Sequence, residues 1–154
     1  WDWLPQDWTM DERFYQYDHW FENERIQDSD VKEYYDHVTG KFDEVLAKHG
    51  YVREGHYYRV EKENEDTLVF FCHFGLECVL VSHLLSVSPM VLWHGACAAP
   101  SSVTTFHTEE RRQGIASFRM SSFGDISHLY ANDEPPAFAA RFCETYSNDK
   151  QRHD

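Results

Sequence analysis

The chain has few positive charges and no long apolar run, and both absences narrow its function. It contains 14 lysine and arginine residues against 27 aspartate and glutamate residues, a formal net charge of −13. Nucleic acids and anionic membranes bind to cationic surfaces, so we expect neither as the main partner. Because no apolar stretch approaches the length of a bilayer crossing, we also expect neither a membrane span nor a signal peptide.

Motifs for metals and nucleotides are missing as well. The sequence has no Cys-x-x-Cys, no His-Glu-x-x-His and no Gly-x-x-x-x-Gly-Lys motif, so we expect no zinc or other metal, no P-loop and no cofactor. Cys72 and Cys97 lie among apolar or small residues, a context typical of buried free thiols. This cysteine usage favours a reduced, cytoplasmic protein.

Aromatic residues, in contrast, are abundant. They make up 16% of the 154 residues, which argues against disorder and leaves enough chain for one domain with a core. Residues 1–29 hold four of the five tryptophans, interleaved with acids, and we expect an irregular segment with short helical pieces. Such a segment either lines a pocket or packs its aromatic side chains on the core.

Several regular elements follow from periodicity. Apolar residues at three- and four-residue steps predict a helix over residues 30–48, which Gly50 ends. Loose alternation predicts a strand or hairpin arm over residues 51–62. Two further alternating stretches, residues 103–108 and 115–121, flank a polar turn and predict an antiparallel hairpin.

The most informative stretch is the apolar run that ends in His73. Residues 67–72 predict a buried strand, and residues 76–85 predict a helix packed on a sheet. His73 would then lie at the carboxyl end of a strand, where ligands collect in open α/β sheets. The backbone N–H groups that follow it belong to a helix start and favour an anion.

The order of these pieces resembles the carboxyl-terminal part of the histidine phosphatase (phosphoglycerate mutase-like) superfamily. The similar pieces are the strand over residues 68–72, His73, the helix through Leu85, the strand over residues 101–105 and the ending Ser127-His128-Leu129. The resemblance covers roughly residues 30–129. It implies a three-layer α/β/α fold with a mixed, mostly parallel sheet that is incomplete in this chain. Residues 1–29 would be a cap or insert, and residues 30–154 the carboxyl-terminal part of a single domain.

The resemblance also implies a site. His73 would face a nucleophilic histidine across the transferring phosphoryl group and donate hydrogen bonds to its oxygens. Phe74 and Gly75 would bind the phosphate through backbone N–H groups, although many family members have glycine directly after this histidine. Ser101 and Ser102 are candidates for binding the substrate, and self-bonded turn serines are the alternative interpretation.

The family's Arg-His-Gly motif, which carries the nucleophile, occurs nowhere in the sequence. We therefore expect the nucleophile upstream, in a missing amino-terminal portion that is this chain's partner, and we expect the chain alone to be inactive. The function implied is phosphomonoester hydrolysis or phosphoryl transfer through a phosphohistidine, with a phosphorylated small molecule as substrate. The alternatives are a phosphoglycerate-type mutase and a non-catalytic binding module or remnant.

Overall fold

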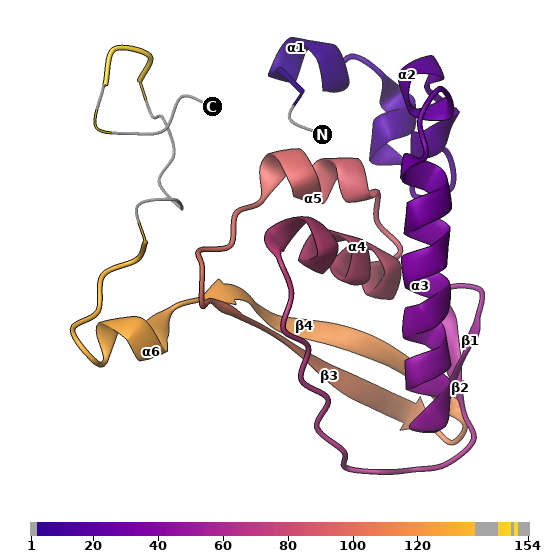
Figure 1. Cartoon of the computed structure of the whole chain (residues 1–154). Coiled ribbons are helices and arrows are strands. Elements are labelled where there is room, and N and C mark those ends of the chain that lie inside the picture. Colours follow the sequence, from indigo (N-terminus) through magenta and orange to yellow (C-terminus); the bar gives the residue numbers. More distant parts are fainter. Residues whose placement is uncertain (1–2, 138–144, 149, 151–154) are drawn as a thin grey trace. The chain divides into compact units, whose positions relative to one another are not determined.

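A computed structural model of the chain describes residues 3–137, 145–148 and 150 (Figure 1). The fold is mixed α/β. The chain divides into two compact units, one formed by Trp1–Ala96 with Thr108–Arg119 and the other by Cys97–His107 with Met120–Asp154. The two units are described in turn. None of the helices in the described part of the chain combines the length and the apolar composition needed to cross a bilayer.

The first unit begins with four short helical pieces, as the sequence predicts. They are α1 (Pro5–Trp8), the 3-10 turns η1 (Glu12–Tyr15) and η2 (Trp20–Glu22), and α2 (Glu24–Gln27). Asp11 links them, because its carboxylate accepts hydrogen bonds from the Arg13 guanidinium at 2.7 Å and from Asn23 Nδ2 at 2.8 Å. The hydrogen bonds from Arg13 hold the pKa of Asp11 well below its usual range. A charged, half-buried pair thus fixes the path of this segment.

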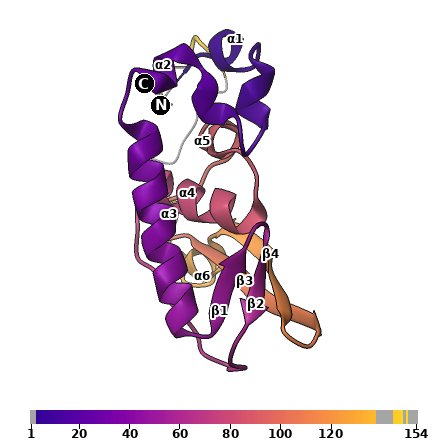
Figure 2. The same cartoon turned by 90° about the vertical axis from the view of Figure 1, so that its right-hand side faces the viewer.

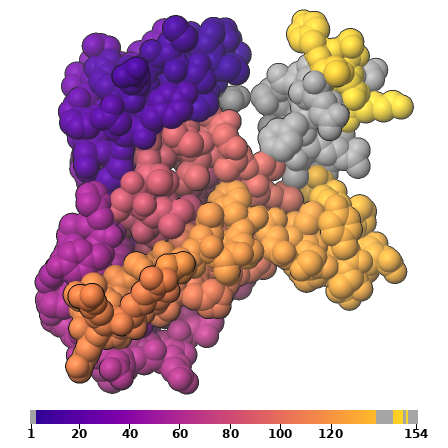
Figure 3. All heavy atoms as spheres, turned by 180° about the vertical axis from the view of Figure 1, so that it is seen from behind, coloured from indigo at the N-terminus to yellow at the C-terminus, as the bar shows by residue number. Residues whose placement is uncertain are grey.

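The aromatic side chains of this segment enter the core. Phe14, Trp20 and Ile26 are buried in one cluster with Tyr35, Val79 and Met90. Figure 3 shows the indigo amino-terminal segment lying directly against helix α5 (Pro89–Gly95). Packing of aromatic residues on the core is therefore observed. That residues 1–29 also cap an active site stays a prediction.

Helix α3 (Val31–Lys48) confirms the predicted helix and joins two parts of the core. Tyr35 belongs to the first cluster, whereas Phe42 and Leu46 belong to a second one near the sheet. Tyr34, which the periodicity places with the apolar residues, is 69% exposed. The helix ends before Gly50, which has a φ of +88°. Glycine adopts such a positive φ at little energetic cost because it has no Cβ.

The sheet has four strands in the order β1-β2-β4-β3. They are β1 (Tyr51–Glu54), β2 (Tyr57–Val60), β3 (Val103–Arg112) and β4 (Ile115–Asp125). β1 pairs with β2, and β2 with β4, in antiparallel register. The predicted hairpin of residues 103–108 and 115–121 is confirmed, and residues 51–62, predicted as a strand or hairpin arm, form a complete hairpin. The expectation of a mostly parallel sheet is wrong for the described residues. Tight turns at Gly55 and Gly114 return the chain at once, which gives antiparallel neighbours, whereas parallel neighbours need a crossover helix.

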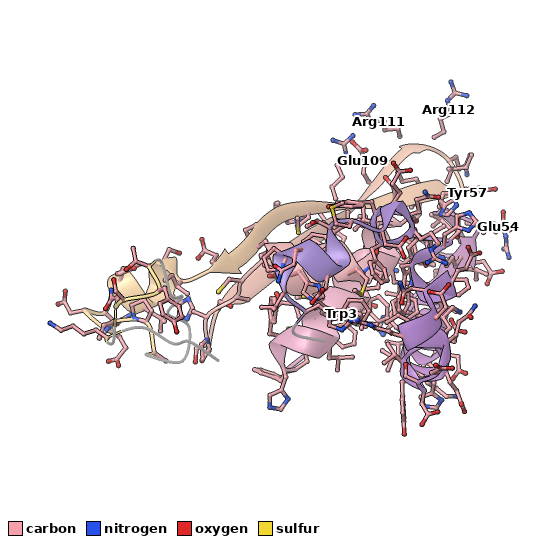
Figure 4. All side chains as sticks on the ribbon, turned by 90° about the horizontal axis from the view of Figure 1, so that it is seen from above. Trp3, Glu54, Tyr57, Glu109, Arg111 and Arg112 are labelled. Carbon is pink, nitrogen blue, oxygen red and sulfur yellow. The ribbon has the colours of Figure 1, made fainter. Side chains whose placement is uncertain are left out.

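One face of the sheet in the first unit is buried and the other is polar. Tyr51, Tyr58 and Ala116 pack against α3, and the Phe118 ring meets that of Tyr58 edge to face at 4.8 Å. Figure 2 shows α3 running alongside β1 and β2. The opposite face carries alternating charged residues, and Figure 4 shows Arg111 and Arg112 pointing outward near the β3–β4 turn. This alternation is what an antiparallel sheet with one solvated face requires.

Residues 67–72 are not a strand, contrary to the prediction. They run in an extended path from the hairpin to helix α4 (Phe74–Leu85), and among the described residues no backbone hydrogen bond is made by them. Val69 is 69% exposed and Phe71 is 97% exposed. Leu68 packs partly on the second cluster, and the Phe70 ring meets that of Phe42, a member of this cluster, edge to face at 5.4 Å. The physical reason is that a strand exists only beside another strand, and no described segment pairs with this one.

The second unit contains the first half of β3 and the second half of β4. Thr104 Oγ1 accepts a hydrogen bond from the Gly124 backbone N–H at 2.9 Å, which ties these two halves together. The short helix α6 (Ser127–Tyr130) follows β4 and contains the Ser-His-Leu ending. His128 is exposed there. Of the cysteines, Cys143 lies outside the described residues, and Cys72 and Cys78 are free thiols.

Candidate functional site

His73 occupies the position directly before helix α4, and the prediction that it lies at the carboxyl end of a strand is wrong, because residues 67–72 form no strand. Its backbone is extended, with φ −87° and ψ 158°, its carbonyl accepts the Glu77 N–H at 3.0 Å, and its side chain makes no capping hydrogen bond. The imidazole is exposed. An exposed imidazole at the start of a twelve-residue helix lies in the positive end of the helix dipole, where an anion is favoured. His73 can therefore donate a hydrogen bond to an anion from solvent.

Phe74 and Gly75 form the first turn of the same helix, and both are half-buried. The Gly75 carbonyl accepts a hydrogen bond from Trp93 Nε1 at 3.1 Å, so the start of α4 is attached to α5. Glu77, one turn further on, adds negative charge to this region. Partial burial, and the charge of Glu77 as the smaller cause, raise the pKa of the neighbouring Cys72 thiol. The helix start is thus rigid, with an acid close to it.

Ser101 and Ser102 lie in the other compact unit. Ser101 adopts a left-handed conformation with φ 68°, and the Ser102 N–H donates to the Ala99 carbonyl at 3.0 Å. This is a turn, the geometry of the alternative interpretation of the two serines. Because the two units are described separately, a joint site of these serines with His73 stays a prediction.

A second constellation, which the sequence did not predict, lies wholly within the first unit. The Tyr17 hydroxyl lies 3.0 Å from His83 Nδ1, and His83 Nε2 lies 2.9 Å from the Asp43 carboxylate. His83 is 6% exposed. Tyr17 comes from the amino-terminal segment, Asp43 from α3 and His83 from α4, so three separate elements meet at one imidazole.

The polar network continues through Arg53 on β1. Its guanidinium donates to the Tyr58 hydroxyl at 2.8 Å, to the His83 carbonyl at 2.9 Å and to Ser86 Oγ at 3.3 Å. Burial raises the pKa of Tyr58 to about 12. Burial also raises the pKa of Tyr35, whose hydroxyl is hydrogen-bonded to Ser82 Oγ at 2.8 Å. Both tyrosines therefore stay protonated at neutral pH and act as hydrogen-bonding groups.

A hydroxyl, an imidazole and a carboxylate in series are the groups from which an activated nucleophile is built. Here the same contacts satisfy the polar atoms of a buried site: within the described residues, every buried side-chain nitrogen and oxygen has a partner. We assign Tyr17, Asp43 and His83 to holding the elements together. One sequence feature could have indicated this network: His83 lies on the apolar face of a predicted helix, where a buried imidazole needs hydrogen-bond partners.

The described residues contain no group of three or more histidine, cysteine, aspartate or glutamate side chains arranged to hold a metal ion. The start of α4, with the exposed His73 beside its first turn, is an arrangement that can receive a ligand from solvent. No protein-family model matches the sequence, and no curated protein or solved structure is similar to it.

Proposed function

We propose that this chain supplies the phosphate-stabilising histidine, His73, of a histidine phosphatase-type phosphatase or mutase. The nucleophilic histidine comes from a polypeptide outside these residues. The observation that carries the proposal is the exposed imidazole of His73 at the start of α4. An imidazole N–H donor beside the positive end of a helix dipole suits the transfer of a dianionic phosphoryl group.

In this mechanism the nucleophile's ring nitrogen forms a bond to phosphorus while the bond from phosphorus to the substrate oxygen breaks. Negative charge then lies on the three equatorial oxygens. A ring N–H of His73 donates to one of these oxygens, and backbone N–H groups of the first turn of α4, at Phe74 and Gly75, donate to another. Water, or a second substrate hydroxyl in a mutase, then takes the phosphoryl group from the phosphohistidine.

The apolar run at residues 67–72 supports the need for a further polypeptide. Val69, Phe70 and Phe71 are 69%, 46% and 97% exposed, an unusual density of exposed apolar surface. An extended run with unpaired backbone binds a further strand by β-augmentation. A strand added there would bury these rings, complete a three-layer α/β/α domain and place a residue of the added polypeptide close to His73.

The proposal makes separate predictions for the chain alone and for the complete gene product. The chain alone, with inorganic phosphate as the probe, should show ¹⁵N amide shifts at Phe74 and Gly75, and His73→Ala should abolish them. His107→Ala is the matched control, because His107 is also exposed but lies on β3. Unchanged phosphate shifts in His73→Ala would contradict the assignment of His73.

Turnover requires the complete gene product. There, His73→Ala should reduce hydrolysis of p-nitrophenyl phosphate by roughly 10²–10³, the cost of losing one preorganised donor, whereas His107→Ala should leave it unchanged. The chain alone should show no turnover. Phosphate binding without any turnover of the complete product would favour the non-catalytic module instead. A screen of phosphorylated substrates with an acceptor hydroxyl distinguishes phosphatase from mutase, because both use the same residues.

A further inference from the structure

A pocket opens between the amino-terminal segment and the helices α2, α3, α4 and α5. Its volume is about 370 Å³, within the range of pockets that hold small molecules. The lining residues are Trp3, Arg25, Ile26, Ser29, Val31, Gly75, Met90 and Trp93. All of them belong to the first compact unit. His73 is not among them, although Gly75, in the first turn of α4, is.

The walls of the pocket are apolar and held in place. The Trp93 ring meets that of Trp20 edge to face at 5.9 Å, and its N–H is already bonded to the Gly75 carbonyl. The Trp3 ring meets that of Phe14 edge to face at 5.1 Å, and the Trp3 backbone N–H donates to His94 Nε2 at 3.1 Å. With its polar atom satisfied, Trp93 offers a ligand only ring surface.

Arg25 supplies the one charge in the lining. Its guanidinium lies over the Trp3 ring, 5.4 Å from the ring centroid. Trp3 is labelled in Figure 4. Among the described residues, no carboxylate forms an ion pair with this guanidinium, although other arginines are paired, such as Arg13 with Asp11 and Arg59 with Glu54. In a chain with 27 acidic residues, an arginine stacked on a pocket wall with free donors is placed for an external anion.

We propose that this pocket binds a small carboxylate with an aromatic or aliphatic body. The body lies between the two tryptophans, and the carboxylate accepts hydrogen bonds from the Arg25 guanidinium. The Ser29 hydroxyl does not donate to the ligand carboxylate, because it already donates to the Ile26 carbonyl at 2.7 Å. A cationic ligand is repelled by Arg25, and a neutral one leaves the guanidinium unpaired. The inference is independent of phosphoryl chemistry at His73.

The test compares 4-phenylbutyrate with its uncharged analogue 4-phenylbutanamide by isothermal titration calorimetry on the chain. The acid should bind more tightly than the amide. Arg25→Gln should weaken the acid about tenfold, equivalent to about 1.4 kcal/mol, and should leave the amide unchanged. Arg112→Gln is the matched control: Arg112 is exposed, and no ion pair among the described residues involves it.

A second variant tests the apolar wall. Trp3→Ala should weaken both ligands by a similar factor, because it removes ring surface that both contact, and circular dichroism should confirm that the fold is retained. Equal affinities of the unmodified chain for acid and amide would overturn the proposal. So would an absence of binding at millimolar ligand, or an Arg25→Gln variant that binds the acid as the unmodified chain does.

Discussion

The β1–β2 hairpin and residues 67–72 are both extended and rich in aromatic side chains, yet they differ in backbone pairing and in burial. In the hairpin the backbone is paired from Tyr51 to Val60, and Tyr58 is 1% exposed. In residues 67–72 no backbone group is paired with the described residues, and Phe71 is 97% exposed. The two stretches are separated by only a few residues and belong to the same compact unit.

The difference lies in where the partner comes from. The hairpin finds its partner across the turn at Gly55, so the cost of closing the loop is small. Residues 67–72 have no such neighbour, because a polar turn precedes them and α4 follows them. Apolar and β-branched composition makes a stretch able to become a strand, but only a neighbouring strand makes it one.

The largest expected effect is at Tyr58. Tyr58→Ala removes a buried ring that contacts Phe118 and accepts a hydrogen bond from Arg53, and should lower the free energy of unfolding by about 3–5 kcal/mol. Urea denaturation followed by circular dichroism measures it. Tyr57→Ala, on the exposed face of the same strand, should cost less than about 1 kcal/mol. Equal losses in the two variants would mean that the hairpin is not packed as described.

Thiol labelling compares the two regions directly, because Cys72 ends the exposed run and Cys78 lies inside α4. Burial raises the pKa of Cys78 to about 12, and its side chain is fully buried. In a chain with Cys97→Ser and Cys143→Ser, iodoacetamide should modify Cys72 more than about 100-fold faster than Cys78, because Cys78 reacts only after local opening. In denaturant the two rates should converge. Comparable rates in the folded chain would place residues 67–72 inside the core.

Gly50 joins α3 to the hairpin and sharpens the comparison further. Its φ is +88°, and a Cβ there would collide with the backbone carbonyl of Lys62. Gly50→Ala should therefore cost about 2 kcal/mol, measured by urea denaturation. Gly55→Ala is the matched control, because φ is +62° but nothing lies near the new Cβ. A larger loss at Gly55 than at Gly50 would contradict this account.

The smallest expected effect is at Phe71. Phe71→Ser should change the free energy of unfolding by less than about 0.5 kcal/mol, because the ring has almost no contacts to lose. It should, however, reduce self-association at high concentration, measured by light scattering, since an exposed apolar run promotes it. A loss of stability comparable to that of Tyr58→Ala would show that the run is packed.

Elements formed by local interactions could be predicted from the sequence. The helix over residues 30–48 needs only its own periodicity and a terminating glycine, and both hairpins need only alternation beside a turn. The mostly parallel sheet was implied by the family resemblance, which relies on a strand at residues 68–72, and the state of that stretch depends on a partner at a distance. Composition cannot report whether such a partner is present.

The two functional features differ in the same way. The position of His73 at a helix start follows from adjacent residues, and the structure places it there. Tyr17, Asp43 and His83 are far apart in the chain, and no spacing rule connects them. Arg25 was equally hidden, because its importance comes from the Trp3 ring beneath it and from the absence of a described carboxylate partner.

The bond between Tyr17 and His83 has a consequence for shortening the chain. Removing residues up to Met10 deletes Trp3 and Trp8, which are only partly buried. Removing residues through Tyr17 would also open the space that Phe14 fills and leave His83 facing Asp43 without its other partner. In a deletion series, the free energy of unfolding should change little up to Met10 and fall sharply once Phe14 and Tyr17 are removed. Residues 11–20 act as an internal part of the unit and could not be exchanged for those of another protein as an independent module.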